Sequence, residues 1–377
     1  MLHSISRSWP LVLLALCLLF SNSIVYANEE NNEEALTTEI LSLESEVVVP
    51  ETFWQPPEDS IDEAAPTMAL IPPPPLEPPP LKQLTLMLDW YLSPQHAALI
   101  VAQERGLFAA QGLEVELQTP ADPSIAIKLL AAGEVDLALS RQPLLHLNAH
   151  DGVPVSRIGT LFETPLNAVI VAGSEQIEDT PTLLAGLHYG FATREGRDVV
   201  IERLLPRSIR QTDGFLPPES VHFDAASPLR EGRIDAIADG YFHYLPPQLA
   251  TEGITTHVIQ YHDVEIPHHD GLIVLANSDS VIRRAPTWAR FLIALEEASY
   301  WIIDNPDAAW TLLATSHPVL DNTINAAAWE DLLRRMALSP AALDARRYKA
   351  FESFLLQNGL IDEVLPISRL AIDPHSL

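Results

Sequence analysis

From residue 81 onward, short apolar runs alternate with helix-like segments, and this alternation restricts the possible folds more than any other feature of the chain. Runs typical of strands cover 84–88, 113–117, 135–139, 155–161 and 168–172. Helical spacing covers 94–104, 123–132 and 144–149, and a glycine follows each of these segments within three residues. Because glycine adopts the left-handed conformation that ends many helices, these glycines predict helix ends. Strands that alternate with helices predict a parallel sheet with helices on both faces.

A second unit of the same kind follows Gly173, and a helical tail follows that unit. Its strand-like runs cover 188–192, 221–223, 234–238, 258–260 and 272–276, with helix-like segments at 196–205 and 228–232. From residue 280 onward the pattern is nearly all helical. We therefore predict an α/β fold of two lobes, each a mostly parallel sheet flanked by helices, with the tail packed back on the first lobe. The expected boundaries are 81–172 for the first part of lobe 1, 173–270 for lobe 2, and 271–377 for the return to lobe 1 and the C-terminal helices.

The first 80 residues have a different composition from the rest. Residues 1–27 are predicted to be a secretory signal, because Arg7 precedes ten apolar residues at 11–20 and Val25-Tyr26-Ala27 fits a cleavage site. Lipidation at Cys17 and retention as an uncleaved anchor are the alternatives. Residues 28–80 hold thirteen acidic residues, clustered prolines and no Lys or Arg. Such a segment is expected to be a disordered linker, or else a docking peptide for a partner.

Composition excludes several classes of function. The formal net charge of −29 disfavours nucleic acid as a partner, because phosphates need Lys and Arg. The single cysteine, Cys17, allows no disulfide within the chain. Four histidines between 257 and 269 have irregular spacing, so we expect no metal site. The motifs of hydrolases and nucleotide enzymes are missing. We therefore expect a binding protein without catalytic residues, metal or cofactor.

Polar and aromatic residues follow the predicted strands, at the edge where open parallel sheets bind ligands. Trp90 and Tyr241 would come from opposite lobes and hold a flat ring between them, with Asp89 accepting hydrogen bonds from its N–H groups. Arg141 or Arg194 could bind an anionic group. The remaining candidates after strands are Ser140, Gln142, Thr193 and Gly196, the last at a helix start that offers backbone N–H groups. The alternative is that the aromatic residues pack in the core and that Arg194 lies at an exposed helix start.

The stretch 86–112 (LMLDWYLSPQHAALIVAQERGLFAAQG), together with 113–116, 133–138 and 152–155, resembles the SsuA/THI5-like family. This family contains thiamine-pyrimidine proteins and related periplasmic substrate-binding proteins, including binding components of ABC importers and a eukaryotic branch of pyrimidine synthases. The resemblance covers about residues 82–305 and implies a two-lobed periplasmic-binding-protein fold of type II.

The resemblance also assigns roles to single residues. In the family, the residues at Asp89 and Trp90 contact the pyrimidine, and a histidine is usual at His96. The segment 270–274, which begins with Asp270, resembles the strand that crosses back to the first lobe. Two positions depart from the importer pattern: Arg141 replaces an aromatic residue, and Leu245 replaces a glutamate that binds the aminopyrimidine.

The resemblance therefore implies a monomeric periplasmic solute-binding protein that serves the permease and ATPase subunits of an ABC importer. Its ligand would be small and pyrimidine-like, or would contain nitrogen in another form. One alternative is a pyrimidine synthase, against which the cofactor-bearing lysine expected at Ser140, a histidine near Leu144 and a cysteine-rich motif are all missing. A second alternative is a periplasmic sensory or scaffold protein that has kept the binding fold.

Overall fold

The structure, a computed structural model, describes residues 80–376 except 174–183, 206 and 212–213. The predicted signal at 1–27 and all but the last residue of the predicted linker at 28–80 lie outside the described residues. Within the described ranges, no helix is both long enough and apolar enough to cross a membrane.

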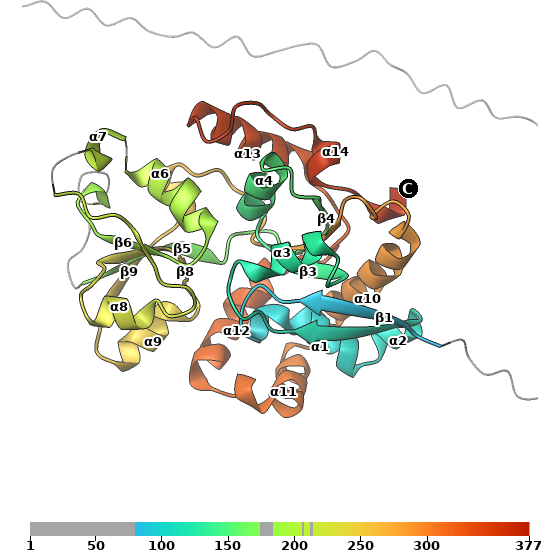
Figure 1. Ribbon diagram of the computed structural model, residues 1–377. Helices are drawn as coiled ribbons and strands as arrows, with labels where there is room; N and C mark the ends of the chain where they lie inside the picture. The colour runs from blue at the N-terminus through green and yellow to red at the C-terminus, as the bar shows by residue number, and fades with distance from the viewer. Residues whose placement is uncertain (1–79, 174–183, 206, 212–213, 377) are drawn as a thin grey trace, which may run out of the picture. The chain divides into compact units, whose positions relative to one another are not determined.

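The first of two five-stranded sheets has the strand order β2-β1-β3-β10-β4 (Figure 1). Its strands are β1 (Lys82–Met87), β2 (Leu113–Gln118), β3 (Leu137–Ser140), β4 (Val155–Phe162) and β10 (Leu272–Asn277). β1 pairs in parallel with β2 and β3, whereas β10 runs antiparallel between β3 and β4. The sheet is therefore parallel except for one reversed strand. We call the part of the chain built on this sheet lobe 1.

The second sheet repeats this plan with the order β7-β6-β8-β5-β9, and we call the part built on it lobe 2. Its strands are β5 (Asn167–Ala172), β6 (Tyr189–Phe191), β7 (Glu219–Ser220), β8 (Ala236–Tyr241) and β9 (Thr256–Ile259). Here β5 is the reversed strand, antiparallel to β8 and β9. The two-lobed fold with mostly parallel sheets is confirmed, and each exception is a strand that the chain enters directly after leaving the other lobe.

Two details differ from the sequence expectation. The range 81–172 expected for lobe 1 includes β5, which pairs in the second sheet, so the chain crosses between β4 and β5. The run at 221–223 is not a strand: β7 ends at Ser220, and His222 adopts a positive φ of 50° that breaks the extended backbone.

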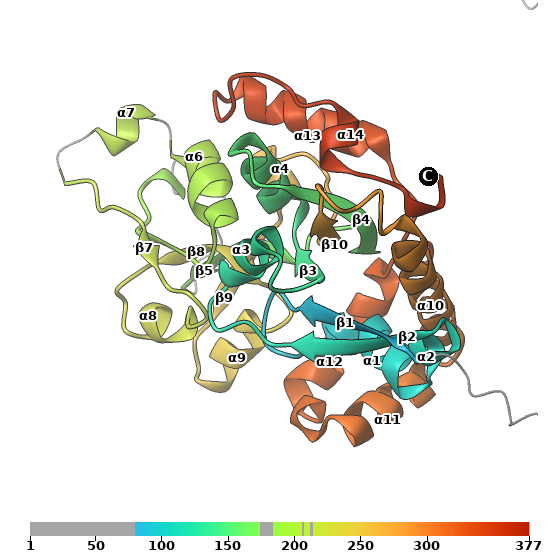
Figure 2. The same cartoon turned by 45° about the vertical axis from the view of Figure 1, so that its right-hand side comes forward.

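Helices cover the sheets as the glycine pattern indicated (Figures 1 and 2). Gly106 and Gly133 adopt left-handed φ angles of 69° and 77° at the ends of their helices. The helices of lobe 1 before the crossing are η2 (Pro94–His96), α1 (Ala97–Glu104), α2 (Leu107–Ala110), α3 (Ile125–Ala132) and α4 (Gln142–His150). Those of lobe 2 are η3 (Glu195–Val200), α6 (Ile201–Leu204), α7 (Arg207–Arg210), α8 (Ala226–Arg230), α9 (Leu245–Thr251) and η4 (Tyr261–Val264).

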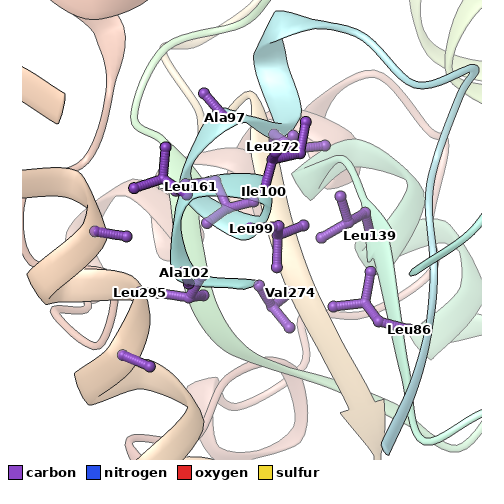
Figure 3. Packing of buried hydrophobic residues seen from close by; sticks show 14 of the residues in the cluster. Leu86, Ala97, Leu99, Ile100, Ala102, Leu139, Leu161, Leu272, Val274 and Leu295 are labelled. Carbon is purple, nitrogen blue, oxygen red and sulfur yellow. The ribbon is translucent and has the colours of Figure 1, made fainter. Parts of the chain in front are cut away.

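The core of lobe 1 lies between its sheet and helix α1 (Figure 3). Leu99 and Ile100 of α1 are fully buried against Leu86, Leu139 and Val274 of three different strands. Helix α1 is buried on its other side too, because the C-terminal helix α10 (Ala285–Asp304) packs over it. Burial of one leucine side chain contributes about 2 kcal/mol, so this layer fixes the β1 strand that precedes the site.

The C-terminal helices contact both lobes. They are α10, α11 (Pro306–Ser316), η5 (Pro318–Leu320), α12 (Thr323–Arg335), α13 (Ala345–Gln357), α14 (Ile367–Leu370) and η6 (Pro374–Ser376). Helix α13 lies beside α4 of lobe 1, and Glu352 accepts hydrogen bonds there from His146 and His150. Its Phe351 also shares an apolar cluster with Tyr261 and Ile266 of lobe 2. The tail packs on lobe 1, as expected, and α13 contacts lobe 2 as well.

Candidate functional site

The carboxylate of Asp89, just beyond the end of β1, joins the two lobes. Tyr241 of β8 donates its hydroxyl to Asp89 over 2.5 Å. His96 Nδ1 accepts the backbone N–H of Ser93, so its protonated Nε2 donates to Asp89 over 3.0 Å. Burial acts to raise the pKa of Asp89, but the hydrogen bonds from His96 and Tyr241 outweigh it and the pKa is lowered. Asp89 is therefore a buried, ionised acceptor held by residues of both lobes.

Trp90 and Tyr241 come from opposite lobes, as predicted, and contact each other. Their ring centroids are 5.1 Å apart with an angle of 68° between the planes. Phe223 meets Trp90 on another side, with centroids 4.6 Å apart. The expected sandwich of a flat ring between Trp90 and Tyr241 has no room here, because the edge of one ring already lies against the other.

A hollow of about 510 Å³, partly open to solvent, lies beside these rings. We call it the aromatic hollow, because Trp90, Phe223, Tyr241 and Tyr244 line it. Asp224, Asp239 and Leu245 also line this hollow.

A second hollow of about 620 Å³ lies between the lobes, and we call it the interlobe hollow. Asp89, Ser140 and Arg141 line it from lobe 1, and Thr193 and Arg194 line it from lobe 2. Ser140 is 3 % exposed, and its hydroxyl has no hydrogen-bond partner among the described residues. Asp89 lines the interlobe hollow and Tyr241 lines the aromatic hollow, so their hydrogen bond joins a residue of one wall to a residue of the other.

Arg141 is already paired across the cleft. It is 4 % exposed, and its guanidinium lies 2.9 Å from Glu195 and 4.0 Å from Asp239, both in lobe 2. It also donates to the hydroxyl of Thr193 over 3.4 Å. The positive charge of Arg141 is therefore balanced by carboxylates of this chain, which differs from the expectation that it waits for an anionic group.

Asp239 organises the turn that holds Thr193 and Gly196. It accepts the backbone N–H groups of Ala192 and Thr193, over 2.8 and 2.9 Å, and the hydroxyl of Thr193 over 2.7 Å. A side chain at Gly196 would place its Cβ 2.7 Å from the Asp239 carboxyl. Gly196 lines neither hollow, so its role is to let Asp239 approach the turn.

Three other predicted residues lie outside the aromatic hollow. Arg194 is at the surface, where it pairs with Asp198 over 2.9 Å and with Asp151 of lobe 1 over 2.5 Å. Gln142 accepts the backbone N–H of Asp270 over 2.8 Å, and neither residue lines a hollow. The Asp270 carboxylate is bound instead by Thr160, Arg347 and Tyr348, so it ties the crossing segment to β4 and α13.

Sequence reasoning missed Gln95, Phe223 and Tyr244 as parts of the site. Gln95 donates to Asp89 over 3.3 Å, and Phe223 and Tyr244 supply aromatic walls. Glu195 and Asp239 stood at predicted strand ends but were not chosen as site residues. A carboxylate after two of the predicted strands of lobe 2, together with an arginine after β3 of lobe 1, was the signal that could have identified the ion pair.

Glu195 leads to a prediction about pH. Burial raises the pKa of Glu195 to about 7, against the lowering effect of Arg141, and the Asp239 carboxylate adds to the rise. Between the ordinary value of 4.5 and about 7, the folded protein binds more protons at this group than the unfolded chain does. The stability contributed by Glu195 is thus present in full below pH 4.5 and is lost as the pH rises to about 7.

Urea denaturation of the wild type and of Glu195→Gln across this interval measures the effect. The free energy of unfolding of the wild type minus that of the variant is expected to decrease as the pH rises. A difference that stays constant or increases would contradict the assignment.

Comparisons with known proteins show which family the chain belongs to. The family model described as NMT1/THI5 like matches residues 93–309. A protein of Haemophilus influenzae, provisionally named for thiamine biosynthesis, is 35 % identical over 296 residues, which cover 78 % of this chain and 92 % of that protein. The formylaminopyrimidine-binding protein of Halalkalibacterium halodurans is 33 % identical over 244 residues, which cover 63 % and 71 % of the two chains.

Solved structures confirm the two-lobed fold. The periplasmic aliphatic sulphonate binding protein SsuA of Escherichia coli superposes with a TM-score of 0.57 at 16 % identity, covering 76 % of this chain and 91 % of that one. The ligand-binding component of an ABC-type import system from Staphylococcus aureus gives a TM-score of 0.59 at 12 % identity, covering 77 % and 96 %. The match of the family model and the similarity to the Haemophilus influenzae protein show that this chain belongs to the NMT1/THI5-like family.

Proposed function

We propose that this protein is the solute-binding component of an ABC importer and that its lobes close on a small pyrimidine-like or other nitrogen-containing ligand. The observation that carries the proposal is the junction of Asp89, Trp90 and Tyr241, where a buried acceptor is bonded to one of two aromatic rings, one from each lobe, that line the aromatic hollow. The name of the relative from Halalkalibacterium halodurans, a formylaminopyrimidine-binding protein, supports the ligand class.

In this proposal Trp90 and Tyr241 contact the ligand ring. Asp89 loses the hydrogen bond that Gln95 or Tyr241 donates to it and accepts one from the ligand instead. His96 orients the Asp89 carboxylate. Ser140, Arg141 and Thr193 form the wall of the adjoining interlobe hollow.

Contacts across the cleft would hold the closed state. Arg141 pairs with Glu195, Asp151 with Arg194, and Asp122 of lobe 1 with His222 of lobe 2 over 2.7 Å. The last two pairs are exposed and weak, so they cannot keep the lobes closed alone. A ligand that contacts both lobes shifts the equilibrium toward closure by its greater affinity for the closed state.

The rest of the chain fits the same function. We propose that residues 1–27 direct export to the periplasm, that 28–80 form a spacer, and that the folded part acts as a monomer beside separate permease and ATPase subunits. The structural relatives from the periplasm support this placement.

Catalysis is not part of the proposal. The 4-amino-5-hydroxymethyl-2-methylpyrimidine phosphate synthase THI5 of Saccharomyces cerevisiae is 24 % identical over 259 residues. At the position where the resemblance places the cofactor-bearing lysine of the synthases, this chain has Ser140. A hydroxyl forms no imine with an aldehyde cofactor, which supports a binding role.

Native mass spectrometry and calorimetry with 4-amino-5-hydroxymethyl-2-methylpyrimidine test the proposal. We expect one bound molecule per chain and a dissociation constant of about 1 µM or lower, typical of a specific small-molecule site. Pyridoxal phosphate retained by the purified protein would instead favour the enzyme. A protein that carries no small molecule and takes up neither this pyrimidine nor its amine and phosphate analogues would overturn the importer function.

A further inference from the structure

The side chains that line the aromatic hollow include two carboxylates, those of Asp224 and Asp239. We propose that it selects a positively charged ligand, namely a heteroaromatic ring that carries a protonated amine or a quaternary nitrogen. The inference rests on the proposed function in one respect only, that the aromatic hollow is the ligand site.

The walls of the hollow suit a cation because they are aromatic on several sides. Trp90 stands nearly perpendicular to Phe223, at 85°, and Tyr241 stands at 80° to Tyr244. Rings set at such angles present faces in different directions, and the faces of aromatic rings attract cations within about 6 Å. A neutral apolar ligand would gain from the same surface only by burial.

The charged side chains of the hollow are acidic. Asp224 and Asp239 line it, and no Lys or Arg is among its described lining residues. Its basic side chain, His222, has 65 % of its side-chain surface exposed and is paired with Asp122 over 2.7 Å. Asp224 accepts the backbone N–H of Ser227, which lowers the pKa of its carboxyl and keeps it ionised at neutral pH.

The nearest arginine does not neutralise these acids. Arg141 lines the interlobe hollow, and its single charge is shared between Glu195 at 2.9 Å and Asp239 at 4.0 Å. Because the pKa of Glu195 is raised to about 7, Glu195 is only partly ionised at pH 7, and the two carboxylates with Arg141 leave a partial excess of negative charge on the lobe 2 side. Asp224 adds a second carboxylate. Arg230 and Arg233 attract it, but neither lines the hollow. Each of these arginines is paired with other carboxylates, Arg230 with Glu252 and Arg233 with Glu219 and Glu231. A cation entering the hollow therefore meets a negative potential that an anion would oppose.

Calorimetry with three pyrimidines that differ only in charge tests the inference on the full chain. The probes are 4-amino-5-aminomethyl-2-methylpyrimidine, which carries an ammonium group at pH 7, its neutral 5-hydroxymethyl analogue, and the phosphate ester of that alcohol. We expect the ammonium compound to bind about tenfold more tightly than the alcohol, because an attractive contact with desolvated aromatic faces and carboxylates replaces a neutral one. The phosphate is expected to bind least tightly.

The variant Asp224→Asn removes the negative charge of this side chain and leaves its size almost unchanged. Asparagine keeps a side-chain oxygen that can accept the Ser227 N–H, so this bond is retained while the charge is removed. The ratio of ammonium to alcohol affinity should fall by about threefold or more. Asp279→Asn, an exposed site after β10, serves as the matched control and should leave the ratio unaltered.

Equal or tighter binding of the alcohol, or tightest binding of the phosphate, would overturn the charge inference while leaving the proposed function in place. A ratio that Asp224→Asn leaves at the wild-type value would overturn the role of Asp224. If none of the three compounds binds, the proposed function itself fails.

Discussion

Replacing Trp90 by alanine is expected to lower the affinity for the ligand by more than about tenfold, because stacking and burial against an indole together contribute a few kcal/mol. Trp90 lines the aromatic hollow and touches both Phe223 and Tyr241, so its loss removes a wall and loosens two others. The dissociation constants of Trp90→Ala and wild type, measured by calorimetry with the ligand that native mass spectrometry identifies, give the effect.

Tyr91→Ala is the matched control for this experiment. Tyr91 is the next residue, is 52 % exposed, and contacts Phe223 with centroids 4.5 Å apart, but it does not line the hollow. Its removal should change affinity by less than about threefold. If Trp90→Ala binds as tightly as wild type while remaining folded by circular dichroism, the ligand does not occupy the aromatic hollow.

Gly271→Ala is expected to destabilise the protein by about 3 kcal/mol or more, because overpacking against an immobile backbone cannot be relieved by a rotamer change. A Cβ at Gly271 would lie 2.0 Å from the carbonyl oxygen of Thr164 and 3.1 Å from the Cα of Pro165. Gly271 precedes β10, and residues 164 and 165 lie between β4 and β5, so the two crossing segments touch at this glycine. Urea denaturation monitored by circular dichroism measures the change in the free energy of unfolding.

Gly159→Ala provides the comparison for Gly271→Ala. A Cβ at Gly159 would meet Cδ2 of Leu292 at 2.6 Å, and that contact is the end of a flexible side chain. The expected loss is about 1 kcal/mol, since Leu292 can move aside. Equal stability losses in the two variants would show that the crossing segments separate easily and that the contact at Gly271 does not hold them together.

Sequence reasoning identified the elements of the fold because the patterns that specify them are local. The glycines after α1 and α3 marked helix ends, and they adopt the left-handed backbone that such ends require. The position of β10 between β3 and β4 could not be predicted in this way. Residues 272–277 pair with residues 155–162, and the whole of lobe 2 lies between these segments in the sequence. The bridging position of α13 is nonlocal for the same reason.

The residues of the candidate site also fall into two groups, those that a local sequence signal predicted and those that had no such signal. Asp89, Trp90 and Tyr241 were predicted because they stand at strand ends in a recognised stretch, and the structure brings them together. Phe223 could not be predicted, because the turn at His222 that directs the chain there has no glycine to mark it. Asp270 was expected to bind the ligand, but its carboxylate meets Arg347 and Tyr348, which lie 77 and 78 residues further along the chain.

The place of β10 in the first sheet also bears on the order in which the chain can fold as it is synthesised. β4 pairs with no strand of the described chain other than β10, so its backbone groups have no sheet partner until residues 272–277 have emerged. The second sheet, in contrast, is complete within residues 167–259. The second lobe can therefore reach its final pairing first, while the first lobe waits with an open edge. An unpaired apolar strand is a site for aggregation, so lobe 1 is open to aggregation from the folding of lobe 2 until β10 has paired with β4.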